Sequence, residues 1–242
     1  ATIPVNREAA SGFGIMRIDE EQRIREFVEK PKDAEVVDSL KLSGAIRDEL
    51  GIKAIDDQFL ASMGIYIFNR DVLVDLLDSD HADFGKHIIP DAIHTRRSFS
   101  HVYQGYWEDV GTIKTFFDAN LDAASELPKF NFFDMSAPFF TRPRFLPASK
   151  INSAAIDHAV LSDGCIINLA QISHSIVGVR SVVGSGTKLH RVVMMGADFY
   201  ETDYSIKEHH SQNIPAIGIG SNTRIENAII DVGFENDWIL PH

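Results

Sequence analysis

The chain has 242 residues, of which 44% are hydrophobic and 24% charged, so it is neither a disordered tail nor a disulfide-stapled miniprotein. Lys and Arg together number 23 against 35 for Asp and Glu, and the formal net charge of -12 argues against a nucleic-acid partner held by phosphate neutralisation. Small anionic substrates remain compatible with this charge, because they need only one or two well-placed cations.

The single cysteine, Cys165, excludes an intrachain disulfide and a structural zinc site built on cysteines, and it favours a reducing, cytoplasmic setting. No apolar run approaches the roughly 18 to 20 residues that span a bilayer, and no signal peptide opens the chain. Residues 1–5 predict a buried strand without an initiator Met. We therefore expect the chain to be the later part of a longer protein.

Residues 1–127 alternate short β-rich runs with helical periodicity, which is typical of an α/β layer structure. The following elements are expected, in chain order: a β-hairpin over 13–18 and 24–28, an irregular helical insertion over 33–52, a buried strand over 62–68, a helix begun by Asn69, a strand over 98–107, and a helix capped by Thr112 with an apolar stripe of Ile113, Phe116, Phe117 and Leu121.

Residues 128–150 form a connector between this region and the next. Its prolines preclude a regular helix, and its many Phe side chains would not be left in water. We therefore expect a connector that packs rather than a loose linker. The residues concerned are Pro128, Phe130, Phe132, Phe133, Pro138, Phe139, Phe140, Pro143, Phe145 and Pro147.

Residues 151–242 follow a six-residue period. Apolar residues recur every sixth position, with glycines and turn residues between them, which is the signature of a hexapeptide β-helix. A stretch over 196–216 breaks the period and predicts a loop that leaves the coil. The repeating positions are Val160, Ile166 and Ile172, then Val177, Val183 and Leu189, and later Ile219 and Ile225.

The segment Glu26–Pro31 is the strongest candidate for chemistry. A strand that ends in Glu29 and Lys30 and is stopped by Pro31 presents a carboxylate and an ammonium at a strand terminus, where α/β sheets bind ligands. Lys30 suits a phosphate, and Glu29 can accept hydrogen bonds from sugar hydroxyls. The alternative is a solvated pair on the edge of a hairpin.

A second candidate is the segment Tyr106–Thr112, in which acids follow a predicted strand and precede a helix cap. Carboxylate oxygens are suitable ligands for Mg²⁺, and Asp109 is the residue concerned. The alternative is that Asp109 helps to cap the helix begun by Thr112.

Other polar residues stand out in the second half. His158, His174 and His190 lie sixteen apart, and stacked histidines would suggest a hexapeptide acyltransferase with a histidine general base. Exact stacking in a coil with three hexads per turn requires a spacing of eighteen residues, so we expect these to be surface histidines. Arg142, Arg144 and Lys207 could bind an anionic effector, or they could simply be solvent-exposed cations.

Several stretches together resemble ADP-glucose pyrophosphorylase (glucose-1-phosphate adenylyltransferase), in its cyanobacterial and plant form. They cover most of the chain to about residue 231. The matching segments are Ser11–Met16, Glu26–Pro31, Ala61–Tyr66, Asp83–Gly85, Tyr106–Thr112, Arg142–Arg144 and Met195–Asp198.

The resemblance implies an α/β Rossmann-like nucleotidyltransferase domain followed by a left-handed parallel β-helix, and transfer of an adenylyl group from ATP to glucose 1-phosphate for glycogen or starch synthesis. It implies that Gly14, Glu29, Lys30 and Ser62 contact glucose 1-phosphate, that Lys30 and Asp109 are catalytic, and that Asp109 holds Mg²⁺. A homo- or hetero-tetramer is expected, in the cytoplasm or a plastid. An anionic allosteric effector would meet Arg142, Arg144 and Lys207.

Two departures from the family matter. The Gly-rich nucleotide loop and a second metal-binding Asp are absent, so the α/β domain is incomplete and the chain alone should not be a complete catalyst. The end after about residue 231 also leaves the hexapeptide pattern. Two alternatives remain: a sugar-1-phosphate nucleotidyltransferase that uses another base or sugar, and a non-catalytic regulatory subunit of the same family.

Overall fold

The computed structural model describes residues 1–53, 57–81 and 83–231. The predicted departure at the end of the chain lies almost wholly outside these residues. The chain forms two compact units, which meet in sequence between Gly105 and Tyr106. Each unit is described by itself.

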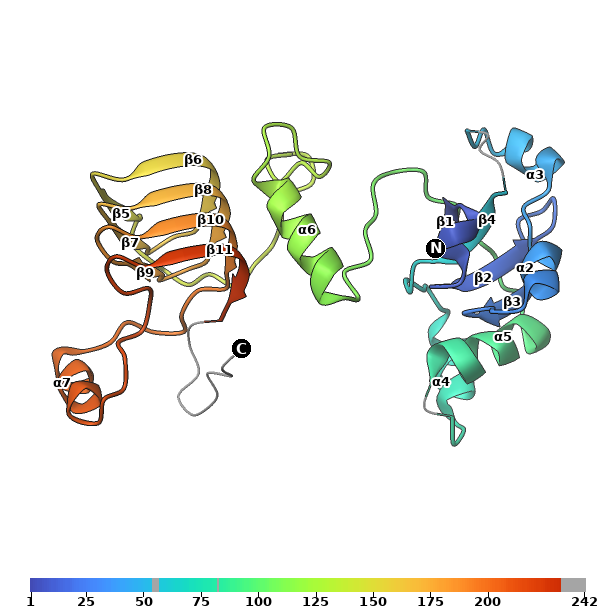
Figure 1. Ribbon diagram of the computed structural model, residues 1–242. Helices are drawn as coiled ribbons and strands as arrows, with labels where there is room; N and C mark the ends of the chain where they lie inside the picture. Colours follow the sequence, from blue (N-terminus) through green and yellow to red (C-terminus); the bar gives the residue numbers. More distant parts are fainter. Residues whose placement is uncertain (54–56, 82, 232–242) are drawn as a thin grey trace. The chain divides into compact units, whose positions relative to one another are not determined.

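The first unit is built on a four-stranded sheet with the order β1-β4-β2-β3 (Figure 1). All neighbours pair antiparallel, and the predicted opening strand and hairpin are confirmed. Gly14 pairs with Glu29 across the hairpin. The strands are β1 (Thr2–Val5), β2 (Gly14–Ile18), β3 (Ile24–Glu29) and β4 (Phe59–Ser62).

Apolar side chains cover both faces of this sheet. Successive residues of a strand point to opposite faces, so Ile15 packs in one buried cluster with Phe59 and Ala61, whereas Met16 packs in another with Leu60. The helices are α1 (Arg7–Ala10), α2 (Ala34–Ser39), α3 (Gly44–Glu49), α4 (Arg70–Leu77), the π-helical turn η1 (Phe84–Ile88) and α5 (Ile89–Thr95). Helices α1 and α2 contribute to the first cluster and α3 and α5 to the second, while α4, η1 and α5 form a third around Leu76 and Ile88.

The helical insertion over 33–52 is confirmed as the two short helices α2 and α3. Asp33 and Ser43 begin them, and each side chain accepts a hydrogen bond from a backbone N–H of the first turn. The helix after Asn69 is also confirmed, although the Asn69 side chain makes no capping hydrogen bond.

Two predicted strands of the first unit are wrong. The strand expected over 62–68 lies earlier and ends at Ser62, because Gly64 adopts a φ of 70° and turns the chain out of the sheet, leaving Ile67 99% exposed. The stretch 98–107 forms only isolated bridges, since its hydrogen bonds are divided between β1 and the turn of the β2–β3 hairpin.

The second unit begins with the helix α6 (Ile113–Ala123), which packs against the β-helix strands β8 and β10. Thr112 caps it as predicted, forming a capping box with Thr115. On the β-helix side, the Arg191 guanidinium lies 5.8 Å from the centre of the Phe117 ring. The sequence grouped this helix with the first domain, but its packing partners belong to the second unit.

The connector after α6 is only partly packed. Phe130, Phe132 and Phe139 form one cluster, with ring centres 5.0 to 5.7 Å apart. Phe133, Phe140 and Phe145 are 86%, 95% and 95% exposed, so the expectation that all six Phe side chains are buried is wrong. The frequent prolines keep the segment extended, and an extended chain cannot turn every side chain toward one cluster.

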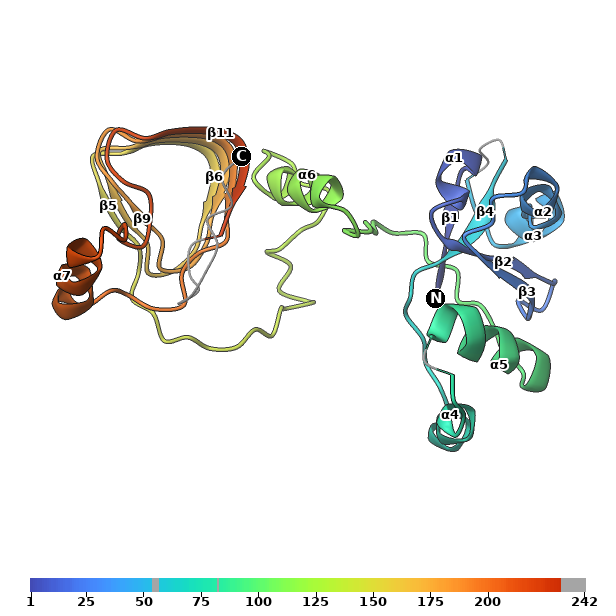
Figure 2. The ribbon, with the colours of Figure 1, turned by 60° about the horizontal axis from the view of Figure 1, so that its bottom comes forward.

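The rest of the unit is a parallel β-helix, as the six-residue period predicts. One sheet has the order β11-β10-β8-β6 and the other β5-β7-β9, all parallel. Figure 2 looks nearly along the stack and shows its turns superposed. The strands are β5 (Lys150–Asn152), β6 (Ala155–Leu161), β7 (Ile166–Asn168), β8 (Gln171–Val177), β9 (Val182–Val183), β10 (Lys188–Met194) and β11 (Arg224–Ile230).

The predicted hexad residues Ile172, Val177, Val183 and Leu189 are buried on the axis of the coil. Two predicted positions are wrong, because Val160 is 40% exposed and the buried residue beside Ile166 is Ile167. The loop predicted over 196–216 is confirmed as an excursion between β10 and β11. It contains a helix that was not predicted, α7 (Asp203–Ser211), which stands away from the coil in Figure 1.

Candidate functional site

The four residues expected to contact a sugar phosphate lie at one edge of the first sheet. Gly14 begins β2, Glu29 ends the adjacent β3 and Lys30 follows it. Ser62 ends β4, whose Ala61 pairs with Ile15. The antiparallel pairing therefore brings Gly14, Glu29, Lys30 and Ser62 together, although they are far apart in sequence.

Gly14 has no room for a side chain. A Cβ atom at this position would lie 2.7 Å from Glu29 Oε2 and 2.5 Å from the Phe27 ring. The space above Gly14 is therefore occupied by the carboxylate of its cross-strand partner. A contact between Gly14 and a sugar stays a prediction.

Lys30 adopts a backbone conformation that is rare for a residue with a side chain. Its φ is 47°, in the left-handed region, and its N–H donates a hydrogen bond of 3.0 Å to the carbonyl of Phe13. Such residues cost energy and cluster at binding sites and active sites. The side chain of Lys30 is exposed, so its ammonium is accessible to a ligand.

Ser62 is joined by aromatic residues to which the sequence assigned no role. Its hydroxyl shares a hydrogen bond of 3.1 Å with the Tyr66 hydroxyl, and the Tyr66 ring stacks on Phe84 with centres 6.3 Å apart. Both residues occur in segments that carry the family resemblance. Their proximity depends on the turn after β4, which the sequence misplaced.

Phe84 begins the π-helical turn η1, a type of turn that is often found at functional sites. Asp83 precedes it and accepts a hydrogen bond of 2.9 Å from the backbone N–H of Lys86. This hydrogen bond holds the pKa of Asp83 below its usual range. The turn brings Gly85 beside Glu29, where a Cβ atom would lie 3.1 Å from Oε2.

A cavity of about 550 Å³ lies elsewhere in the first unit, lined by apolar residues of α4 and α5 and by Arg96 and Arg97. Tyr66 borders it, but Glu29 and Lys30 do not. We therefore place the candidate site at the strand ends and not in this cavity.

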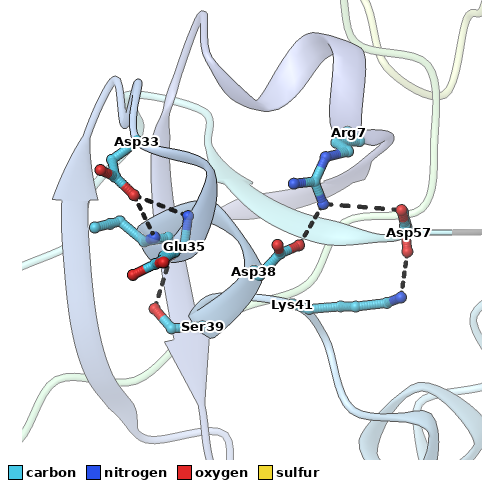
Figure 3. Close-up of polar contacts among 8 residues, drawn as sticks. Arg7, Asp33, Glu35, Asp38, Ser39, Lys41 and Asp57 are labelled. Carbon is cyan, nitrogen blue, oxygen red and sulfur yellow. Dashed lines mark hydrogen bonds and ion pairs between the residues drawn. The ribbon is translucent and has the colours of Figure 1, made fainter.

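An exposed cluster of charges joins α1 to α2 (Figure 3). Arg7 forms an ion pair with Asp38 and lies 3.9 Å from Asp57, which also pairs with Lys41. The hydrogen bond from Arg7 lowers the pKa of Asp38. Because all four side chains are exposed and paired with one another, we assign the cluster a structural role of modest energy.

The second unit holds the proposed metal ligand, Asp109, on the irregular segment before α6. The helix cap itself is made by Thr112 and Thr115, so Asp109 is an exposed carboxylate that is not needed for it. Within the described ranges, no group of three or more His, Cys, Asp or Glu side chains could hold a metal ion.

The proposed effector cations lie on separate segments of the second unit. Arg142 and Arg144 are exposed in the connector, and Lys207 is exposed on α7. Their role in binding an anion remains a prediction.

Two of the three histidines of the β-helix, His158 and His174, stack, contrary to the argument from spacing, whereas His190 meets His174 edge-on at 72°. The His158 and His174 rings are parallel within 5° with centres 4.9 Å apart, and His190 approaches His174 at 5.7 Å. A spacing of sixteen suffices because a turn here takes sixteen or seventeen residues: Ala155 pairs with Gln171, and Gln171 with Lys188. The histidines are exposed, as expected.

Two family models match the chain. One described as "Nucleotidyl transferase" covers residues 1–126, and one described as "GLGC left-handed parallel beta-helix domain" covers residues 144–235. The protein is therefore a nucleotidyl transferase domain followed by a left-handed β-helix, and both parts of the predicted fold class are confirmed.

A relative from Zea mays, named "Glucose-1-phosphate adenylyltransferase large subunit 1, chloroplastic/amyloplastic", is 44% identical over 236 residues. These residues are 95% of this chain and 45% of the relative. The chain belongs to the glucose-1-phosphate adenylyltransferase family, and it spans slightly less than half the length of that relative. In the part of the chain that the structure describes, no helix is both long and apolar enough to cross a membrane.

Proposed function

We propose that this chain provides the glucose 1-phosphate site of an enzyme that makes ADP-glucose and pyrophosphate from ATP, for glycogen or starch synthesis. One observation carries the proposal: Gly14, Glu29, Lys30 and Ser62 converge at one sheet edge, with Lys30 in a left-handed conformation. Family membership supports it.

In the proposed reaction, a phosphate oxygen of glucose 1-phosphate attacks the α-phosphorus of ATP in line with the departing pyrophosphate. A new P–O bond forms as the bond between the α-phosphorus and the bridging oxygen breaks, and pyrophosphate carries away the electron pair. Lys30 would hold the phosphate of the substrate. The Glu29 carboxylate would accept hydrogen bonds from the sugar hydroxyls, and the Ser62 hydroxyl could donate or accept one. Catalysis would rest on positioning and charge stabilisation, without a covalent enzyme intermediate.

Mg²⁺ belongs to this proposal as the partner of the nucleotide phosphates. A protein typically supplies Mg²⁺ with one or two carboxylates beside the substrate phosphates, and Asp109 is the carboxylate that we propose. The described residues contain no complete ligand set of their own. Bound Mg²⁺ would neutralise the charge that develops on the phosphates.

The assembly, regulation and location of the protein are also proposals. We propose a homo- or hetero-tetramer with an anionic effector near Arg142, Arg144 and Lys207, in the cytoplasm or a plastid. The name of the Zea mays relative describes a subunit and the chloroplast or amyloplast, but only for that protein.

Replacing Lys30 with Ala, in a chain that carries the whole catalytic domain, tests the main proposal. Losing a charge-assisted hydrogen bond of about 1.5 to 3 kcal/mol should raise the KM for glucose 1-phosphate by about tenfold to over a hundredfold. The KM for ATP should stay within about twofold, because in this proposal Lys30 contacts glucose 1-phosphate and not ATP. Pyrophosphate release measures both constants.

Lys32→Ala is the matched control, since Lys32 is an exposed lysine two residues further along the same segment. It should leave both constants unchanged. An unaltered KM for glucose 1-phosphate in Lys30→Ala would remove Lys30 from the site. A nucleotide and sugar-phosphate panel separates this function from that of another sugar nucleotidyltransferase.

A regulatory subunit without activity of its own is the second candidate. The name of the Zea mays relative describes a large subunit, which supports an assembly of unlike subunits in which this chain has a regulatory role. A complete chain that releases no pyrophosphate alone, yet changes the effector response of an active partner subunit, would support this alternative over catalysis.

A further inference from the structure

The Glu29 carboxylate is enclosed by two glycines from distant parts of the sequence. Gly14 lies across the hairpin on β2, and Gly85 lies in the π-helical turn η1. A Cβ atom on Gly14 would be 2.7 Å from Glu29 Oε2, and a Cβ atom on Gly85 would be 3.1 Å from the same oxygen. The first value is shorter than real Cβ atoms show and the second is tighter than most, so a methyl group at either position would displace the carboxylate by at least a few tenths of an ångström.

Neighbouring elements fix Gly85 in this place. The helix α5 continues directly from η1 and packs against β3, the strand that carries Glu29 (Figure 1). Asp83 braces the start of the turn through its hydrogen bond to the N–H of Lys86. A Cβ atom on Gly85 would lie at an ordinary contact distance of 3.6 Å from Asp83 Oδ1, so the tight contact of an added methyl group would be with the Glu29 carboxylate.

Glu29 is held here by shape. Over the ranges that the structure describes, its carboxylate takes part in no hydrogen bond or ion pair, whereas many of the other acids of this unit are paired. A carboxylate oriented by steric contact keeps its lone pairs for a ligand. Orientation without internal hydrogen bonds therefore suits an acceptor of sugar hydroxyls.

We propose that Gly85 is a positioning residue for sugar recognition, because its missing side chain lets η1 close over Glu29 and orient the carboxylate toward the hydroxyls of the sugar. This inference rests on the proposed function, since it assumes that Glu29 meets the sugar and Lys30 the phosphate. Gly85 itself touches no substrate. Its effect should therefore fall on the sugar part of the ligand and spare the phosphate part.

The test compares two probes by titration calorimetry on the full chain: glucose 1-phosphate and inorganic phosphate. Gly85→Ala should weaken glucose 1-phosphate binding by about tenfold, since displacing a binding group by a fraction of an ångström to 1 Å has effects of that order. The affinity for inorganic phosphate should stay within about twofold. Gly44→Ala is the matched control, because the added methyl group there meets only a flexible arginine at 3.8 Å.

A second pair of variants shows whether Gly85 acts through Glu29. In a Glu29→Ala background the carboxylate is gone, so Gly85→Ala should cause no further loss of affinity. If Gly85→Ala fails to fold, as judged by circular dichroism, the double variant Glu29→Asp/Gly85→Ala replaces it. The shorter side chain clears the methyl group, so this double variant should bind as well as Glu29→Asp alone.

The outcomes separate the two proposals. If the unmodified chain binds glucose 1-phosphate and Gly85→Ala binds it equally well, the role of Gly85 is refuted while the proposed function stands. A loss that persists in the Glu29→Ala background, or one that affects inorganic phosphate equally, also refutes it. If the unmodified chain binds neither probe, the proposed function fails and the inference fails with it.

Discussion

Lys30 combines a charged side chain with a backbone angle that favours glycine. Its φ of 47° places the Cβ atom close to the backbone, which costs roughly 1 to 2 kcal/mol for a residue other than glycine. Gln22 and Asp57 of the same unit share this conformation, so the angle alone assigns no role, and the part of Lys30 in binding stays a prediction. The sequence predicts a lysine at the end of a strand, but it does not predict the φ angle of that lysine.

Replacing Lys30 with Gly should therefore separate stability from binding. The free energy of unfolding should rise by up to about 1 kcal/mol as the strain is relieved, while glucose 1-phosphate binding is lost with the ammonium. Urea unfolding and calorimetry measure the two effects. Lys30→Ala should lose binding without gaining stability, so equal stabilities of the two variants would contradict the role of the backbone angle.

Asp83 should give the first unit part of its sensitivity to acid. Because its pKa is lower in the folded protein than in the unfolded chain, its contribution is complete above the unfolded pKa, near 4, and is lost as the pH falls through the folded pKa. Asn also caps helices but does not titrate in this range. Asp83→Asn should therefore preserve stability at pH 7 and flatten its decline below pH 4.

Unfolding followed by circular dichroism between pH 2 and pH 7 measures this difference. The control is Asp80→Asn, three residues earlier in the sequence and exposed, which should leave the profile unchanged. Parallel profiles for Asp83→Asn and the unmodified protein would show that the hydrogen bond from Lys86 does not govern this pKa.

At the scale of elements, the β-helix strands show which structural features can be predicted from the sequence. The apolar period predicted the inward positions Val177, Val183 and Leu189, whose side chains are enclosed by the coil, but it misplaced Val160 and Ile166. The length of a turn was not readable. His158, His174, Arg191 and Asn227 have φ angles of 46° to 53° at equivalent positions of the strands β6, β8, β10 and β11. His and Asn favour this conformation more than most residues, but the preference is too weak to locate it in a sequence.

The residues buried on the axis should dominate the stability of the coil. Ile167 is fully buried, and its neighbour in the same ladder, Ile151, is 45% exposed. Ile167→Ala should lower the free energy of unfolding by about 2 to 5 kcal/mol, since it leaves a cavity. Ile151→Ala is the matched control and should cost about 1 kcal/mol or less.

Urea denaturation followed by far-ultraviolet circular dichroism compares these two variants. Similar losses for both would show that the coil is not held chiefly by its axis. The predicted strands that failed, over 62–68 and 98–107, lie outside the coil, and a single turn residue, Gly64, decided the first of them. The second, over 98–107, divides its hydrogen bonds between β1 and the β2–β3 hairpin, and local sequence does not reveal such partners.

At the scale of the molecule, the boundary between the two units was misplaced by one helix, α6, which belongs to the second unit. The apolar stripe of α6 predicts a helix that buries one face, but amphipathicity does not identify the partner. The structure identifies it as strands β8 and β10. The net charge of -12 likewise says nothing of where cations are placed, and Lys30 had to be located by the pairing of strands.

The connector should be the first site of cleavage by chymotrypsin, which cuts after aromatic residues. Phe133, Phe140 and Phe145 are exposed on a segment without helix or strand, the kind of segment that proteases prefer. Brief digestion should release a fragment that begins after one of them. Mass spectrometry identifies the ends, and earlier cleavage after the buried Phe59 would contradict the arrangement described.

The excursion that carries α7 leaves the coil after β10 and returns before β11, and these two strands are direct neighbours. Ala197, at its start, donates a hydrogen bond to the carbonyl of Val179, and Ile219, at its end, donates one to the carbonyl of Val182, so both ends are attached to the same preceding turn. The length of the detour therefore does not change the register of the stack. Each added turn of the coil would lengthen the column by one strand spacing, about 4.8 Å, and leave its cross-section unchanged. Such a coil can therefore accept insertions that add new surface while its buried interior stays the same.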